Sequence, residues 1–419
     1  MRTLSFNRIA IPADLSSRLS IAADEAAADS TGLPAASVAA IWQAVEDLYR
    51  SGVFPAITFC LRHRGNILLQ RGLGHARGFG PGQDDESAAV AVRYDDPICL
   101  FSASKAVTAM LVHWLNQEGL IDLTDPISRY IPEYGVQGKK NATIYHLLTH
   151  RGGIPRLEGD FEPELLFDHA AIVQRLCAAR PVSRSGRRLA YHALTAGFIL
   201  GELIQRVTGK DARHLLDRVI RQPMGMRHFS FGLPIEQRAR LIAHHATGLR
   251  PLFPMDRYLH HVLGASLETA VDMSNDPRFL DALIPAGNIY ASAEEACRFF
   301  EMLRQRGRYG DVQVFEPATV HRAILEAQGP ELDTSLLLPM RYSMGFMLGS
   351  RPIGLFGPQT SQAFGHLGFT SIFCWADQAR DSSVALMTSG KALLGPHLPA
   401  LAKLLYTLSH QLPSGAAQK

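Results

Sequence analysis

Ser102 and Lys105 stand three positions apart in Ser102-Ala103-Ser104-Lys105, directly before the apolar run 106–112. If that run is helical, positions i and i+3 share a face, so the hydroxyl and the amine can touch. A serine becomes a nucleophile when a base takes its proton, and a buried lysine can be that base because desolvation lowers its pKa. Among the lysines, only Lys105 has a serine three residues before it. This Ser-x-x-Lys pair predicts covalent catalysis; the alternative is that Ser102 only caps the helix.

A Ser–Lys pair also needs a group that moves a proton to the leaving group, and donors that stabilise an oxyanion. Tyr191-His192-Ala193 precedes an expected helix that begins near residue 197, and the glycine-containing segment 364–369 is expected to form a strand. By residue type alone, Tyr191 is also compatible with a core tyrosine. His366 is likewise compatible with a hydrogen bond across the sheet.

In their joint order and spacing, these motifs resemble the serine β-lactamase and penicillin-binding-protein superfamily. Within it, the nearest match is the class C-like branch that includes the family VIII carboxylesterases. The resemblance covers most of the chain, from about residue 36 to residue 410. Its markers are the segments 101–105, 147–155, 191–193, 201–203, 222–226, 285–288 and 366–368.

The resemblance implies three catalytic side chains. Ser102 resembles the acylated nucleophile, Lys105 resembles its base partner, and Tyr191 resembles the tyrosine that moves protons between nucleophile and leaving group. No cofactor is implied, and the expected partner is a small-molecule ester.

The resemblance also implies an oxyanion hole and a substrate-binding strand edge. The backbone N–H groups of Ser102 and Phe369 resemble the oxyanion donors. His366, Leu367 and Gly368 resemble the strand edge along which substrate binds, and Gly368 fits a close approach to the backbone.

The sequence departs from the superfamily pattern at two positions. Ala193 stands where an asparagine often contacts the lysine and a substrate amide. His366 stands where a lysine often holds a substrate carboxylate, so a fixed cation is replaced by a titratable group. Both departures favour uncharged esters over β-lactams and peptides.

The sequence therefore predicts a serine carboxylesterase that hydrolyses small uncharged esters through an acyl-enzyme. A β-lactamase or D-Ala-type peptidase remains an alternative, as does an acyltransferase, because an alcohol and water compete for the same acyl-enzyme. A catalytically inert binding protein on this scaffold is a further alternative, since a fold does not guarantee chemistry.

Other kinds of site are disfavoured. His146 and His150 have the i, i+4 spacing of a helical zinc pair, but Leu147 stands where a zinc protease has glutamate, so no metal is expected. No Gly-x-Ser-x-Gly elbow and no glycine-rich phosphate loop is present in the sequence.

Composition fits a globular protein: of 419 residues, 47% are hydrophobic and 19% charged, with a net charge of +3. The sequence has no dense basic run and no apolar stretch of spanning length, so nucleic acid and a membrane span are not expected. Five dispersed cysteines predict buried free thiols in a reducing compartment. No signal peptide is recognised, so the expected location is cytoplasmic.

The expected fold is α+β, an antiparallel sheet flanked by helices with a mostly helical insertion. Residues 1–33 form an arm, 34–119 and 285–412 a discontinuous sheet domain, and 120–284 the helical insertion domain. The segment 250–276 is expected to be irregular and to form a wall or lid of a pocket. The expected elements are helices at 34–51, 102–119, 197–208, 211–220 and 397–412, and strands at 56–63, 66–73, 361–367, 371–376 and 383–388.

Overall fold

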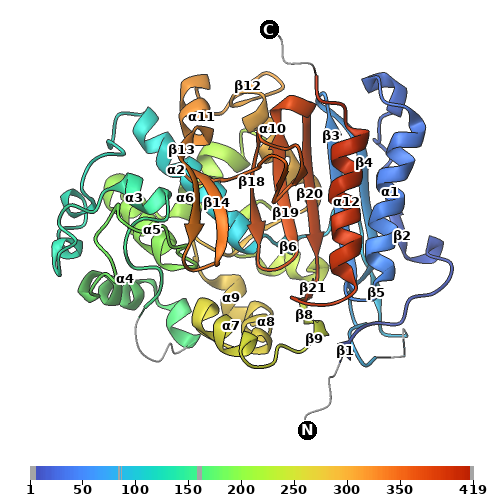
Figure 1. Ribbon diagram of the computed structural model, residues 1–419, viewed down its shortest axis with the longest axis horizontal. Helices are drawn as coiled ribbons and strands as arrows, with labels where there is room; N and C mark the ends of the chain where they lie inside the picture. The colour runs from blue at the N-terminus through green and yellow to red at the C-terminus, as the bar shows by residue number, and fades with distance from the viewer. Residues whose placement is uncertain (1–5, 84, 86, 158–162, 416–419) are drawn as a thin grey trace.

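The computed structural model describes residues 6–83, 85, 87–157 and 163–415, and a large antiparallel sheet forms its centre (Figure 1). Within that part of the chain the strand order is β13-β14-β15-β18-β19-β20-β3-β4-β2, with β5 paired to β4. The strands are β2 (Leu19–Ile21), β3 (Ala56–His63), β4 (Asn66–Arg77), β5 (Val90–Ala91), β13 (Glu326–Asp333), β14 (Leu338–Ser343), β15 (Met347–Leu348), β18 (Ala363–Gly368), β19 (Ile372–Asp377) and β20 (Ser382–Thr388). The expected antiparallel sheet built from both ends of the chain is confirmed.

Helices cover both faces of the sheet. On one face, α1 (Ala35–Arg50) packs beside α12 (His397–Gln411), and on the other α10 (Ala293–Arg304) contacts β19, β20 and β3 (Figure 1). Alternate residues of β19 belong to the two cores: Phe373 packs in the cluster that contains α1 and α12, and Cys374 in the cluster that contains α10. The central strands are therefore buried on both sides, which explains why they are largely apolar.

Helix α2 (Ser104–Gln117) lies between the sheet and a mainly helical region. Most of its side chains are buried, as expected of a helix that is apolar on every side. The helices of this region are α3 (Ile144–Leu148), α4 (His169–Ala178), α5 (Thr195–Thr208), α6 (Ala212–Leu216), α7 (Met255–Leu263), α8 (Leu267–Ser274) and α9 (Pro277–Asp281).

Short elements complete the described chain. The remaining helix is α11 (Pro317–Ile324), and the short strands are β1 (Phe6–Asn7), β6 (Ile98–Cys99), β7 (Ser230–Phe231), β8 (His245–Ala246), β9 (Gly248–Leu249), β10 (Ile289–Ala291), β11 (Arg308–Tyr309), β12 (Val312–Gln313), β16 (Ile353–Gly354), β17 (Gly357–Pro358) and β21 (Gly390–Lys391). The five cysteines are buried and free, as expected. No helix among the described residues is long and apolar enough to cross a membrane.

One expectation about local structure was wrong. The segment 250–276 is not irregular, because it forms α7 and α8; the Ser266 side chain accepts the Thr269 N–H and caps α8. Within the segment 1–33, β2 pairs with β4 as the edge strand of the sheet. The hairpin of β3 and β4 is confirmed.

Candidate active site

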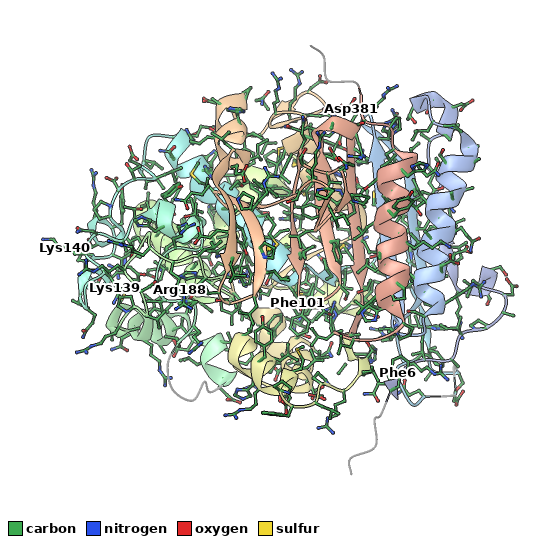
Figure 2. The ribbon with its side chains drawn as sticks, in the orientation of Figure 1. Phe6, Phe101, Lys139, Lys140, Arg188 and Asp381 are labelled. Atoms are coloured by element: carbon green, nitrogen blue, oxygen red, sulfur yellow. The ribbon has the colours of Figure 1, made fainter. Side chains whose placement is uncertain are left out.

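Ser102 lies in a short 3-10 turn, η3 (Phe101–Ala103), that leads into α2, and Lys105 occupies the first turn of α2. Figure 2 shows this turn, marked by Phe101, at the end of the sheet that faces α7 and α8. Lys105 Nζ lies 2.9 Å from Ser102 Oγ and 3.1 Å from Ala286 O. No side chain caps η3 or α2 in this described stretch, so Ser102 does not have the capping role that was its alternative.

Burial tunes the amine of Lys105 for proton transfer. The side chain is enclosed in the core, and desolvation lowers its pKa from 10.5 to about 7. A large fraction of Lys105 is therefore a neutral amine near neutral pH. Such an amine, next to a partly exposed hydroxyl, can take the Ser102 proton.

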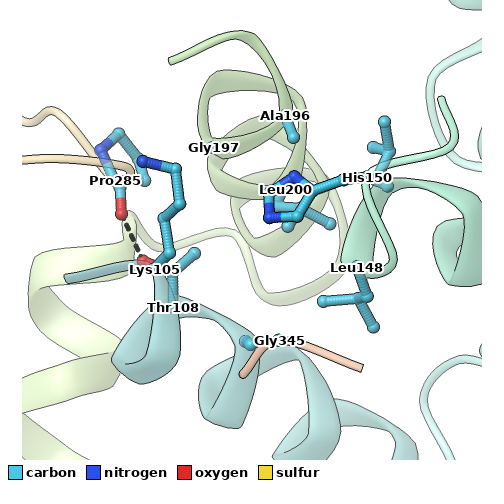
Figure 3. A pocket seen from close by; sticks show the side chains of 11 residues that line it. Lys105, Thr108, Leu148, His150, Ala196, Gly197, Leu200, Pro285 and Gly345 are labelled. Carbon is cyan, nitrogen blue, oxygen red and sulfur yellow. Dashed lines mark hydrogen bonds between the residues drawn. The ribbon is translucent and has the colours of Figure 1, made fainter. Parts of the chain in front are cut away.

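The acceptor Ala286 O is held in place by α2. The Ser104 hydroxyl accepts the Ile289 N–H at 3.0 Å, and the Thr108 hydroxyl donates to Pro285 O (Figure 3). Three successive polar residues of this helix face, Ser104, Lys105 and Thr108, therefore bind one backbone segment. The marker segment 285–288 thus acts as a fixed support for Lys105.

Helix α5 presses against the same segment through two glycines. A β-carbon added at Gly197 would lie 2.5 Å from Ala286 Cβ, and one added at Gly201 would lie 2.7 Å from Pro285 Cγ. Larger residues at either position would push the segment 285–288 away from Lys105. This close approach explains why a glycine, which has no side chain, stands at the marker position 201.

Tyr191 lies beside the Ser–Lys pair, just before α5. Lys105 Nζ sits 5.0 Å from the centroid of the Tyr191 ring. The Tyr191 N–H donates to Asp333 Oδ1 at 3.0 Å, and Asp333 Oδ2 accepts from the Tyr342 hydroxyl at 3.0 Å. Burial raises the pKa of the Tyr191 phenol, while its hydrogen bond with Ser102 acts in the opposite direction. The phenol is therefore protonated at neutral pH and can donate a proton.

The marker segment 147–155 shapes the chain that carries Tyr191. His150 O accepts the Ala190 N–H at 3.1 Å, and Arg151 O accepts the Gly186 N–H at 2.9 Å. At Gly153, where φ is 89°, a β-carbon would lie 2.4 Å from the carbonyl oxygen of Ser183. These contacts bring the marker segments 147–155 and 191–193 together in the structure, although both are far from Ser102 in the sequence.

Two phenylalanines at the site have strained backbones. Phe101 and Phe369 have φ values of 46° and 49°, and their ring centroids lie 5.2 Å apart. Bulky residues rarely adopt positive φ, and such strain often concentrates at functional sites. A β-carbon at Gly368 would lie 2.2 Å from Leu100 O, so glycine is required for the packing of the strand edge against the Ser102 turn.

His366 is buried on β18, and its ring centroid lies 6.2 Å from that of Tyr191. Burial, and next the charge of Lys105, lower its pKa to about 3. Its Nδ1 lies 2.7 Å from Leu367 O, and the Leu367 side chain packs in the core cluster that includes Tyr191. His366 is therefore neutral near pH 7 and provides no cation at this strand edge.

His146 and His150 do not converge on a common point. Their Nδ1 atoms accept different backbone N–H groups: Thr143 N–H for His146, at 3.1 Å, and His192 N–H for His150, at 3.2 Å. Among the described residues, no group of three or more His, Cys, Asp or Glu side chains is placed to hold a metal ion.

Several residues of the site were not found by sequence reasoning. They are Ser104, Thr108 and Asp333, together with the strained backbones of Phe101 and Phe369. Ser104 and Thr108 could have been noticed as polar residues in an otherwise apolar helix. Positive φ at a phenylalanine leaves no signal in the sequence.

Comparison with known proteins identifies the family to which the chain belongs. The sequence matches the family described as Beta-lactamase over residues 41–406, and the chain belongs to that family. It is 28% identical to the esterase/beta-lactamase LipL of Mycobacterium tuberculosis, over 75% of this chain and 74% of that protein. It is 28% identical to the esterase EstB of Burkholderia gladioli, over 65% of this chain and 71% of that protein.

A crystal structure of a family VIII carboxylesterase has the same fold. It superimposes with a TM-score of 0.78 at 25% identity and covers 91% of this chain and 99% of its own. The expected superfamily and α+β fold are confirmed. The protein is a serine hydrolase of the β-lactamase type.

Proposed function

We propose that this protein is a carboxylesterase that hydrolyses small uncharged esters through an acyl-enzyme on Ser102. The observation that carries the proposal is the contact of 2.9 Å between Ser102 Oγ and a lysine amine whose pKa burial lowers to about 7. A partly exposed nucleophile and its base are thus already in contact. A protonated tyrosine beside them completes the set of groups that acyl transfer needs.

The proposed reaction has two halves. Ser102 Oγ bonds to the ester carbonyl carbon as its proton passes to Lys105 Nζ, and the backbone N–H groups of Ser102 and Phe369 receive the oxyanion. The carbon–oxygen bond to the alcohol then breaks as Tyr191 donates its proton to the departing oxygen, and Lys105 returns a proton to Tyr191. Water attacks the acyl-enzyme by the same steps in reverse and releases the acid.

The absence of charge at the strand edge supports uncharged substrates. His366 is neutral because burial lowers its pKa, and Ala193 offers no amide to a peptide-like group. A neutral imidazole cannot form the ion pair that a carboxylate substrate requires. His366, Leu367 and Gly368 are proposed to border the substrate.

A β-lactamase activity is the second candidate. The printed name of the relative LipL includes both esterase and β-lactamase, and a β-lactam carbonyl would meet the same Ser102 and Lys105. The neutral His366 counts against this candidate because common β-lactams carry a carboxylate. An acyltransferase reaction, in which an alcohol replaces water, uses the same acyl-enzyme.

The test is a comparison of substrates in one assay series. We expect turnover of short p-nitrophenyl esters, a strong preference for a neutral ester over the matching ester with a carboxylate, and slower turnover of a chromogenic cephalosporin. Ser102→Ala should abolish turnover while circular dichroism and thermal unfolding stay unchanged. Equal turnover of the cephalosporin would favour the β-lactamase, and full activity of Ser102→Ala would refute the proposed nucleophile.

A further inference from the structure

The amine of Lys105 has one hydrogen that Ser102 and Ala286 do not bind. A neutral amine that accepts a hydrogen bond from the Ser102 hydroxyl has two N–H groups of its own. An ammonium that donates one N–H to Ser102 Oγ has two further N–H groups. In both states Ala286 O takes one of them at 3.1 Å. Among the described residues, no further acceptor for Lys105 is recorded, so one buried N–H needs a partner.

The side chain of Lys105 lines a small cavity. Its volume is about 20 Å³, and most of its lining is apolar, from residues such as Leu147, Leu148 and Leu200. Its polar side chains are those of Lys105, Thr108 and His150 (Figure 3). One buried water needs about 10–15 Å³ and two to four polar partners, so the cavity has the size and chemistry for a single water.

The hydrogen bonds around the cavity fix what each polar group offers. His150 Nδ1 accepts the His192 N–H at 3.2 Å, and a backbone N–H can only donate, so the proton of this neutral imidazole is on Nε2. Figure 3 shows the His150 ring extending across the cavity toward Lys105. The Thr108 hydroxyl donates to Pro285 O, so its lone pair remains available to accept.

We propose that this cavity binds one water molecule that orients the amine of Lys105, with His150 as a positioning residue. The water accepts the His150 Nε2–H, donates to the Thr108 hydroxyl oxygen and accepts the N–H of Lys105 that points away from Ser102. With its two N–H groups held by Ala286 O and this water, the neutral amine directs its lone pair at the Ser102 hydroxyl. The inference rests on the proposed function of Lys105 as a base.

The surroundings of Lys105 bear on its pH dependence. The titratable groups that face it are Tyr191 and His192 on the segment before α5, His150 after α3 and His366 on β18. All four are neutral near pH 7, because burial raises the pKa of Tyr191 and lowers those of the three histidines. The water therefore adds a polar partner that responds to the charge of Lys105, besides Ser102 Oγ and Ala286 O.

Ala196→Val tests the proposal by filling the cavity from α5. Without the water, the acylation rate should fall roughly tenfold, the cost of one lost hydrogen bond. The acid limb of the rate against pH should move to lower pH, because the ammonium form of Lys105 loses a stronger partner than the neutral amine does. The matched control is Ala296→Val, a buried alanine of α10 that does not line the cavity, which should keep the wild-type rate and pH profile.

A high-resolution crystal structure of the wild type is the independent measurement if Ala196→Val folds poorly. We expect one ordered water within hydrogen-bond distance of Lys105 Nζ and His150 Nε2. An empty cavity, or an Ala196→Val enzyme that matches Ala296→Val in rate and pH profile, would overturn the proposal. A wild-type protein that hydrolyses no ester would instead contradict the proposed function. In that case the electron density of the crystal structure would still show whether the cavity holds a water.

Discussion

The lowered pKa of Lys105 comes from burial, not from neighbouring cations. Desolvation lowers its pKa to about 7, whereas charge repulsion would need a second cation at the site, and the nearby histidines are neutral. The same enclosure keeps the Tyr191 phenol protonated. One apolar environment therefore favours the neutral form of the proposed base and the protonated form of the proposed acid, as acyl transfer needs.

The pH dependence of acylation should follow Lys105. Because the neutral amine is the form proposed to act as the base, kcat/KM for a p-nitrophenyl ester should rise with pH through about 7 and then level off. Lys105→Arg should lose about 10²–10⁴-fold in kcat/KM at every pH tested, since a guanidinium does not deprotonate. Lys210→Arg, at an exposed lysine, is the control. A flat pH profile, or an active Lys105→Arg enzyme, would show that another group is the base.

The element that positions Lys105 is the segment 285–289, which packs between α2 and α5. Hydrogen bonds from Ser104 and Thr108 hold it on one side, and the glycines of α5 let it approach on the other. Its Ala286 carbonyl is thereby fixed against Lys105. A change in α5 should therefore affect catalysis although α5 contributes no proposed catalytic side chain.

Gly197→Ala tests this alignment. Alanine favours a helix by up to about 1 kcal/mol over glycine, but its β-carbon would lie 2.6 Å from Ala286 N, so the segment must shift. We expect kcat to fall at least about tenfold with a modest loss of thermal stability, typical of overpacking by about 1–3 kcal/mol. Gly329→Ala, where the added β-carbon meets open space, should leave kcat unchanged. Equal kcat values for the two variants would show that the segment does not control Lys105.

The sequence predicts well those elements whose own residues determine them. The strands β3, β19 and β20 are largely apolar, and α1 has a clear apolar face, so each was predicted nearly to its ends. By contrast, β13 carries many polar residues and is formed by its pairing with the next strand, β14, which the composition of β13 does not indicate.

The same limit applies within the site. The pairing of Ser102 with Lys105 follows from helical spacing, and Tyr191 followed from the resemblance. The strained φ of Phe101 and the reach of Asp333 to the Tyr191 backbone depend on tertiary structure. Sequence reasoning could therefore propose the reacting groups but not the contacts that hold them.

On the scale of the whole molecule, the Ser102 turn and the terminal helices belong to different cores, although Tyr191 lies in the core that contains the terminal helices. Helices α1 and α12, from the two ends of the chain, pack together on one face, while α2 and the Ser102 turn belong to the core on the other face (Figure 1). Damage to the packing of the terminal helices should therefore lower stability without changing the chemistry of the folded enzyme.

Leu404→Ala measures this separation. Leu404 is fully buried in α12, so its truncation should lower the free energy of unfolding by about 2–5 kcal/mol. The kcat/KM at a temperature well below unfolding should stay unchanged. Leu398→Ala, on the same helix but 42% exposed, should cost far less in urea unfolding. A large loss of kcat/KM in folded Leu404→Ala would mean that α12 supports the site directly.

The most direct test of the central claim is covalent labelling followed by peptide mapping. A fluorophosphonate should modify the wild-type protein once, and mass spectrometry should place the adduct on Ser102. Labelling should be lost in Ser102→Ala and greatly slowed in Lys105→Arg, because the hydroxyl then lacks its base. An adduct on another residue, or no adduct on a folded and ester-hydrolysing enzyme, would contradict the assignment of Ser102 as the nucleophile.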